Sequence, residues 1–135
     1  MAYMEWNETL SVQVREIDAQ HKKLIECVNR LHQAMLDNRG KELHKEIIDE
    51  MCDYAASHFA LEEMYMQRFN YAACEEHRQE HEKFAKEAAE LKARADRGGL
   101  ILTVVMLSFL KDWLQNHILG TDMKYVEHFK RRGLV

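Results

Sequence analysis

Residues 58–81 read "HFALEEMYMQRFNYAACEEHRQEH" and place metal-competent side chains at four-residue spacings within an apolar helical pattern. Glu62 follows His58 at this spacing, and His81 follows His77 in the same way. A four-residue step along an α-helix turns a side chain by only about 40°, so each pair lies on one helix face. Both pairs are in register with apolar neighbours, which predicts that they point into the protein core.

The sequence around this stretch predicts long helices without breakers. Proline is absent, and the glycines lie between apolar series that repeat at three- and four-residue steps. We expect helices over residues 18–38 (with Asp18 as N-cap), 42–69, 73–97 and 100–119, and a short tail helix over 122–131 with Thr121 as N-cap. Short connections make neighbouring helices antiparallel. The predicted fold is an all-α, antiparallel up-and-down four-helix bundle with residues 1–17 as an N-terminal arm.

Composition limits the classes of function. The 135 residues are 47% hydrophobic and 31% charged, which indicates a single domain over residues 1–135. A net charge of −4 with interleaved signs argues against a nucleic-acid partner. The longest apolar stretch, residues 100–110, is too short to cross a bilayer, and residues 1–10 lack a signal-peptide pattern. With neither a membrane span nor a signal peptide predicted, we expect a cytoplasmic location. Cys27, Cys52 and Cys74 lack CxxC spacing, so we expect reduced thiols.

Further metal-competent residues fall on the other apolar faces. His21 is in register with Leu24, and His117 continues the series of Trp113. Asp122 lies five residues after His117, and we expect Gly120 to break the helix so that both side chains reach one site. A lone core histidine is more often a packed, hydrogen-bonded residue than a ligand, but several unpaired buried imidazoles and carboxylates would be costly. The predicted metal ligands are His21, His58, Glu62, His77, His81, His117 and Asp122.

Seven ligands are too many for one zinc ion and suit two metals that share carboxylates. Imidazole donors suit iron, although the general order of affinity favours copper or zinc. The remaining histidines, His32, His44 and His128, lie among charges or beside the apolar series, and we exclude them from the site.

The segments "DAQHK", "HFALEE", "HRQEH" and "NHILGTD" resemble the signature of the hemerythrin family, in particular its bacteriohemerythrin group. The resemblance extends over nearly the whole chain. It implies two iron ions with a bridging oxide or hydroxide, and reversible binding of dioxygen as hydroperoxide at a five-coordinate iron. It also implies that one iron is held by His77, His81 and His117, the other by His21 and His58, and both by Glu62 and Asp122.

Reversible binding requires an apolar pocket that keeps water from the bound oxygen. By helical position near the open iron, we expect this dioxygen pocket to be lined by Phe59, Trp113, Leu114 and Ile118. We further expect acceptors such as Asp18, Glu63 or backbone carbonyls to orient the imidazoles.

Two alternatives to an oxygen-binding protein remain open. One is a diiron oxidase or peroxidase-like enzyme. The sequence shows no evident general acid beside the open iron, which argues against this alternative. The other is a sensory module from a larger signalling receptor, because the family also occurs fused to such domains. The sequence does not identify a redox or oxygen-accepting partner protein.

Overall fold

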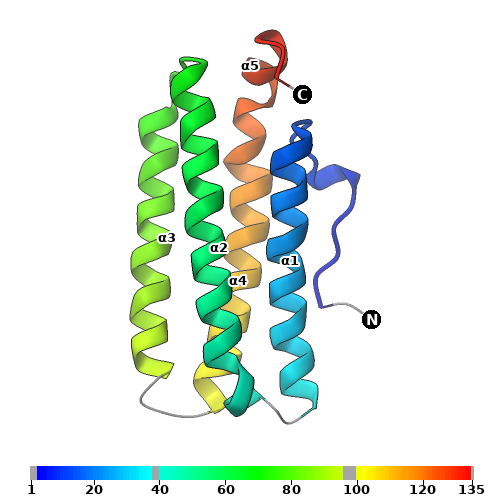
Figure 1. The fold of residues 1–135 in the computed structure, drawn as a ribbon, viewed down its shortest axis with the longest axis vertical. Coiled ribbons are helices and arrows are strands. Elements are labelled where there is room, and N and C mark those ends of the chain that lie inside the picture. Colours follow the sequence, from blue (N-terminus) through cyan, green and yellow to red (C-terminus); the bar gives the residue numbers. More distant parts are fainter. Residues whose placement is uncertain (1–2, 38–39, 96–99, 135) are drawn as a thin grey trace.

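The computed structural model describes residues 3–37, 40–95 and 100–134; of residues 40–45, 95 and 100–103 it describes the backbone alone. Within these residues, four long helices run antiparallel to one another, and no strand is present (Figure 1). The predicted all-α bundle is therefore confirmed. Its elements are η1 (Glu8–Leu10), α1 (Arg15–Leu36), α2 (Gly40–Arg68), α3 (Cys74–Ala95), α4 (Leu100–Gly120), η2 (Asp122–Tyr125) and α5 (Val126–Arg131).

The apolar faces of the helices build the core, as the periodicity predicts. On α1, Leu24, Val28 and Leu31 are spaced by three and four residues and are buried. Each such side chain contributes roughly 1.5–3 kcal/mol when it leaves water. Because the helices alternate in direction, the start of α1, the end of α2, the start of α3 and the end of α4 meet at one end of the bundle, where α5 also lies (Figure 1).

The N-terminal arm is confirmed and lies along α1 (Figure 1). Met4 N–H donates to Asn29 Oδ1 at 2.9 Å, and Asn29 Nδ2 donates to the Met4 carbonyl at 2.8 Å. Trp6 lies under the ammonium group of Lys22, which is 4.2 Å from the ring centroid. A single α1 side chain thus satisfies both backbone groups of Met4, which fixes the path of the arm.

The prediction that Asp18 caps α1 is wrong. The helix begins at Arg15, and the Asp18 N–H already bonds to the Val14 carbonyl at 2.9 Å. The Asp18 carboxylate instead accepts hydrogen bonds from the Ser11 hydroxyl at 2.6 Å and from the Val12 N–H at 2.8 Å. Asp18 lies one turn too far along the helix to act as its cap. Its carboxylate instead holds the arm against α1.

The predicted tail helix is present but divided into a 3-10 segment, η2, and α5. Thr121 precedes η2, but its side chain makes no capping hydrogen bond. In the part of the chain that the structure describes, no helix is long and apolar enough to cross a membrane.

Candidate metal centre

The predicted ligands all lie at the end of the bundle beside α5, and each is at most 4% exposed. They come from α1, α2, α3, α4 and η2, so every long helix contributes at least one of them. Their ligand atoms form two clusters within which all atoms lie within 4.8 Å of one another, and both clusters contain the same two carboxylates. The structure therefore brings together His21, His58, Glu62, His77, His81, His117 and Asp122.

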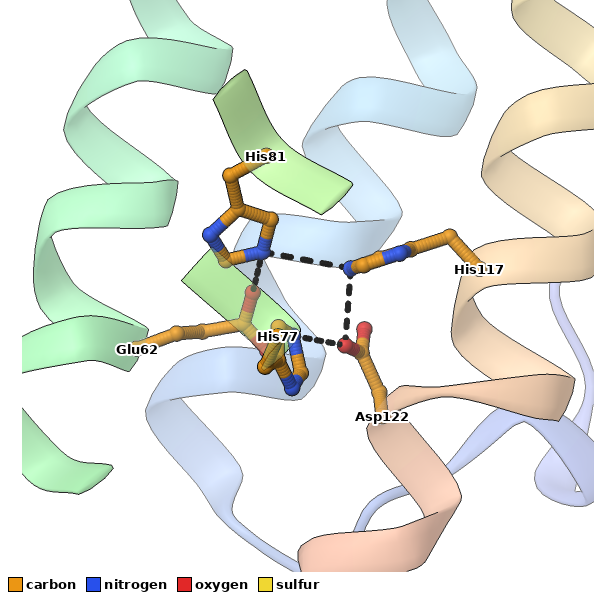
Figure 2. Close-up of side chains that lie close together, drawn as sticks. All are labelled: Glu62, His77, His81, His117 and Asp122. Carbon is orange, nitrogen blue, oxygen red and sulfur yellow. Dashed lines mark hydrogen bonds and ion pairs between the residues drawn. The ribbon is translucent and has the colours of Figure 1, made fainter. Parts of the chain in front are cut away.

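The first cluster contains three histidines (Figure 2). Asp122 Oδ1 lies 2.9 Å from His77 Nε2 and 3.1 Å from His117 Nε2. His81 Nε2 lies 3.4 Å from Glu62 Oε1 and 3.2 Å from His117 Nε2. Three imidazole nitrogens from α3 and α4 thus face one another and two carboxylates.

The second cluster contains two histidines. His21 Nε2 lies 3.1 Å from Asp122 Oδ2, and His58 Nε2 lies 3.1 Å from Glu62 Oε1. The two rings meet edge to face with centroids 4.6 Å apart. Because Glu62 and Asp122 face both clusters, each carboxylate lies between a group of three imidazoles and a group of two.

Asp122 reaches the centre, but Gly120 is not the helix break that the sequence suggested. The Thr121 N–H bonds to the His117 carbonyl at 2.8 Å, so the α-helical hydrogen bonding continues past Gly120. A left-handed glycine conformation is absent there, since the only glycine with positive φ among the described residues is Gly133. The backbone tightens after Thr121, where Lys124 N–H bonds to the Thr121 carbonyl at 3.1 Å, and this switch to η2 aims Asp122 inward.

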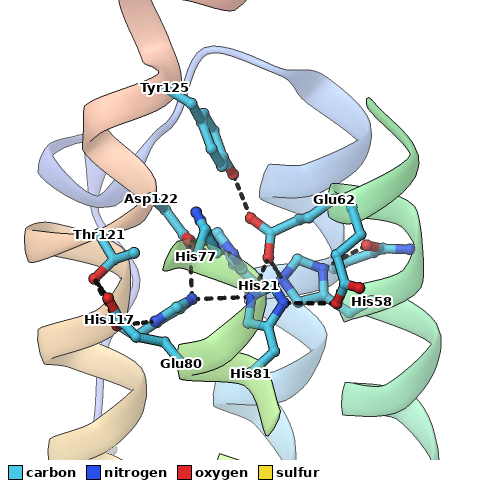
Figure 3. Close-up of polar contacts among 12 residues, drawn as sticks. His21, His58, Glu62, His77, Glu80, His81, His117, Thr121, Asp122 and Tyr125 are labelled. Atoms are coloured by element: carbon cyan, nitrogen blue, oxygen red, sulfur yellow. Dashed lines mark hydrogen bonds and ion pairs between the residues drawn. The ribbon is translucent and has the colours of Figure 1, made fainter. Parts of the chain in front are cut away.

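Polar side chains stand behind three of the imidazoles (Figure 3). Nδ1 of His81 lies 3.0 Å from Glu63 Oε2, and Nδ1 of His117 lies 3.0 Å from Glu80 Oε1. Glu80 also accepts a hydrogen bond of 2.7 Å from the Thr121 hydroxyl. A carboxylate at Nδ1 makes that nitrogen the donor, which leaves the lone pair of a neutral imidazole on Nε2, toward the centre.

Behind His58 stands an amide rather than a carboxylate. Gln20 Oε1 lies 2.5 Å from His58 Nδ1 and accepts a hydrogen bond from it. Nδ1 of His21 and Nδ1 of His77 have no hydrogen-bond partner among the described residues. The three-histidine cluster therefore has two carboxylates behind its imidazoles, and the two-histidine cluster has one uncharged amide.

Tyr125 closes the centre from the side of η2 (Figure 3). It is fully buried, its hydroxyl donates to Glu62 Oε2, and its ring stacks on His77 at 5.6 Å with an interplanar angle of 10°. Burial, together with the nearby charges of Glu62 and Asp122, raises the pKa of Tyr125 well above its usual value. The phenol thus stays protonated and keeps donating to Glu62.

The two buried carboxylates are ionised. Burial and the charge of Asp122 would raise the pKa of Glu62, but His58 and His81 hold it well below its usual range. Burial likewise opposes ionisation of Asp122, yet His117, His21 and His77 keep its pKa well below normal. In return, although burial would lower it, Asp122 and Glu62 raise the pKa of His117 to about 9. The two carboxylates therefore favour the protonated form of His117 when no metal is bound.

These residues fit a metal better than they fit one another. Several buried atoms of the centre make no hydrogen bond with any described residue: both nitrogens of His21, both nitrogens of His77, Glu62 Oε1 and both Asp122 oxygens. Apart from Nδ1 of His21 and Nδ1 of His77, all of these atoms face the centre. The facing nitrogens and oxygens lie 2.9–3.1 Å apart, and cations that take the place of protons between them would satisfy both members of each pair.

Of the four residues predicted to line a dioxygen pocket, Phe59 and Trp113 contact imidazoles of the centre. Phe59 stacks on His81 at 3.9 Å and Trp113 stacks on His117 at 4.3 Å, so both pack against the three-histidine cluster. Phe59 also lies 5.9 Å from the ring of His58. Leu114 and Ile118 are buried in the main apolar core.

Sequence reasoning proposed Glu63 as an imidazole partner but missed Gln20, Glu80 and Tyr125. Tyr125 carries a weak signal, since it follows Asp122 by three residues and so shares its side of a helical turn. Glu80 carries none, because its partner His117 is on another helix. Asp18, the other acceptor suggested, is engaged with the arm.

The histidines excluded from the site have other surroundings where the structure describes them. His32 stacks on Tyr3 with ring centroids 4.5 Å apart, and His128 Nε2 lies 2.5 Å from the Phe69 carbonyl oxygen. The side chain of His44 is outside the described residues.

Comparisons with known proteins agree with this architecture. The model of the hemerythrin HHE cation-binding domain matches residues 12–129. A bacteriohemerythrin of Stenotrophomonas maltophilia is 38% identical over 130 residues, which cover 96% of this chain and 84% of the relative. A hemerythrin-like protein of Naegleria gruberi is 32% identical over 120 residues, which cover 89% of this chain and 88% of the relative. A crystal structure of wild-type hemerythrin superposes with a TM-score of 0.83 at 30% identity, covering 93% of this chain and 97% of the other.

Proposed function

This chain belongs to the hemerythrin family, and from that premise we propose that it holds two iron ions and binds dioxygen reversibly at one of them. His77, His81 and His117 would hold one ion, and His21 and His58 the other. Glu62 and Asp122 would bridge the pair together with an oxide or hydroxide. When both ions are ferrous, they supply the two electrons that reversible binding of dioxygen draws on.

One observation carries this proposal: Nε2 of all five histidines points to the place where the two carboxylates meet. The distances from these nitrogens to the nearest carboxylate oxygens lie between 2.9 and 3.4 Å. Nitrogen and oxygen donors in this ratio suit iron, and the two negative charges leave a pair of divalent ions with net positive charge. That charge would accommodate a small anionic bridge.

The unequal number of histidines supports a place for dioxygen. If Glu62 and Asp122 serve both ions equally, the ion held by His21 and His58 has one protein ligand fewer. The open coordination position would then be on this side.

The residues around the centre would keep water away and hold protons in place. Phe59 and Trp113 cover His81 and His117 with aromatic faces, and apolar surroundings slow the loss of a bound oxygen to water. Tyr125 donates to Glu62 and so holds this carboxylate in a single orientation. Glu63 and Glu80 fix their imidazoles with Nε2 inward.

The proposal is tested by spectroscopy on the iron-loaded chain reduced without air. Admitting air should produce the visible absorption of an oxygenated diiron centre, and removing oxygen should abolish it over repeated cycles. A chain that shows no reversible change does not bind dioxygen in this way. Rapid irreversible oxidation with release of hydrogen peroxide would instead identify an oxidase-like enzyme.

We also propose a cytoplasmic location. Cys27, Cys52 and Cys74 are free thiols, which persist in a reducing compartment. A role as carrier, store or sensor would be separated by the lifetime of the oxygenated form, since carriage requires slow autoxidation.

A further inference from the structure

A cavity of about 190 Å³ lies between α2 and α3, away from the metal ligands. Alanines make up most of its wall, and their short side chains leave the space open. The lining residues are Cys52, Ala55, Ala56, Phe59, Phe84, Ala85, Ala88, Ala89 and Lys92.

The cavity leads from the protein surface into the core. Ala56, Ala85 and Ala89 are exposed, whereas Ala55 and Ala88 are buried. Apart from Cys52 and Lys92, every lining side chain is a hydrocarbon, so the cavity offers water few hydrogen bonds. Its interior therefore suits a small apolar molecule.

The inner end of the cavity reaches the metal centre through one aromatic ring. Phe59 lines the cavity and also stacks on His81, with ring centroids 3.9 Å apart and planes 7° from parallel. The same ring lies 5.9 Å from the ring of His58, which belongs to the two-histidine cluster. Phe84, the second aromatic residue of the wall, meets Phe59 edge to face at 5.6 Å. The Phe59 ring therefore lies between the cavity and His81, with His58 next to it.

We propose that this cavity is the chamber through which dioxygen enters, with Phe59 as the gate between the chamber and the metal centre. The inference rests on the proposed function. Size supports this occupant: dry apolar cavities of about 150 Å³ take up xenon or benzene, whereas drug-sized ligands need roughly 300–1,000 Å³. Dioxygen is small and apolar, and the alanine-lined space places it one side chain away from the ligands.

The chamber is tested first without any reliance on oxygen binding. Crystals of the iron-loaded, oxidised chain are pressurised with xenon, whose anomalous scattering locates its binding sites. We expect xenon between α2 and α3 beside Ala55 and Ala88, and none there in the double variant Ala56→Leu/Ala89→Leu. Absence of xenon from this cavity in the unaltered chain would overturn the proposal, even if the chain binds dioxygen reversibly.

The second test measures how fast the reduced, iron-loaded protein takes up dioxygen in stopped flow. Leucine favours helix and the substituted alanines are exposed, so the double variant should fold. We expect oxygenation and release to slow together by roughly tenfold, with unchanged equilibrium affinity, because entry and exit share one route. Ala60→Leu/Ala93→Leu, with exposed sites one turn further along the same helices and outside the lining, is the matched control and should leave both rates unchanged.

The two proposals fail in different ways. A double variant that excludes xenon yet oxygenates at the rate of the unaltered chain shows that dioxygen enters elsewhere, and the entry chamber is then wrong. An unaltered chain that takes up xenon but shows no reversible oxygenation contradicts the proposed function, and with it the entry chamber.

Discussion

The two histidine clusters share two carboxylates but differ in what stands behind their imidazoles. In the three-histidine cluster, the carboxylates of Glu63 and Glu80 accept from Nδ1 of His81 and His117. In the two-histidine cluster, the uncharged amide of Gln20 accepts from Nδ1 of His58. Nδ1 of His21 has no hydrogen-bond partner among the described residues.

The two halves of the centre are therefore unequal in electrostatics as well as in ligand number. A carboxylate behind an imidazole increases its basicity and fixes its orientation, both of which strengthen a bond from Nε2 to a metal. The three-histidine cluster is also held by stacking of Phe59, Trp113 and Tyr125 on its rings. We therefore expect it to bind metal more tightly, and the two-histidine cluster to be the more open side.

The largest effect should come from removing what the clusters share. Glu62→Ala deletes a carboxylate that faces both clusters and leaves the Tyr125 hydroxyl without its acceptor. We expect iron content, measured by atomic absorption after gel filtration, to fall from about two ions per chain to fewer than one. His32→Ala, which alters a histidine that stacks on the arm, is the control and should keep its iron. Equal iron in both variants would contradict the assignment of Glu62.

Removal of the metal should destabilise the fold next most strongly, and in a definite order. A ligand present at a hundred times its dissociation constant stabilises the native state by about 2.7 kcal/mol, so a chelator should lower the melting temperature markedly. Partial chelation should empty the two-histidine cluster first. A crystal structure of the chain with half of its iron removed tests this order. Iron retained beside His21 and His58 would show that the two-histidine cluster binds metal more tightly, contrary to our expectation.

Glu80→Gln should weaken the three-histidine cluster selectively. The amide can still accept from His117 but no longer carries a charge, and loss of such a partner typically costs 10–100-fold in metal affinity. Competition with a chromophoric chelator measures the change. The control is Glu90→Gln, which removes an exposed carboxylate further along the same helix; the metal affinity of this variant should match that of the unaltered chain.

The smallest effect is expected from Gln20→Glu, which gives the two-histidine cluster the charged partner it lacks. Nδ1 of His58 would then donate to a carboxylate, as Nδ1 of His81 and His117 do. Iron on this side should become more resistant to the chelator, by a smaller factor than the loss caused by Glu80→Gln. The rates at which the two clusters release iron should therefore become more similar. Unchanged release kinetics would show that partner charge is not what separates the clusters.

Much of the fold and of the cluster followed from helical periodicity, because positions one turn apart share a face whatever the tertiary structure. His58 with Glu62, and His77 with His81, are such pairs, and the structure places each pair together. Contacts between side chains on different helices could not be predicted in this way. Glu80 is paired with His117, which is 37 residues away, and nothing in the spacing of α3 selects that partner.

Local backbone geometry was the other source of error. Gly120 was expected to break α4, yet its N- and C-terminal neighbours keep the helical hydrogen bonding and the change occurs after Thr121. A 3-10 turn needs no positive φ, so the change of direction after Thr121 does not depend on the glycine. Aspartate is a common N-cap residue, but the Asp18 carboxylate accepts a hydrogen bond from the Val12 N–H in the arm.

The central claim is that seven buried side chains hold a pair of iron ions in unequal surroundings. Anomalous diffraction at the iron absorption edge, from crystals of the iron-loaded chain, tests it directly. Two peaks are expected between Glu62 and Asp122, one contacted by the imidazoles of α3 and α4 and the other by those of α1 and α2. A single peak, or iron at any other place in the bundle, would contradict the account.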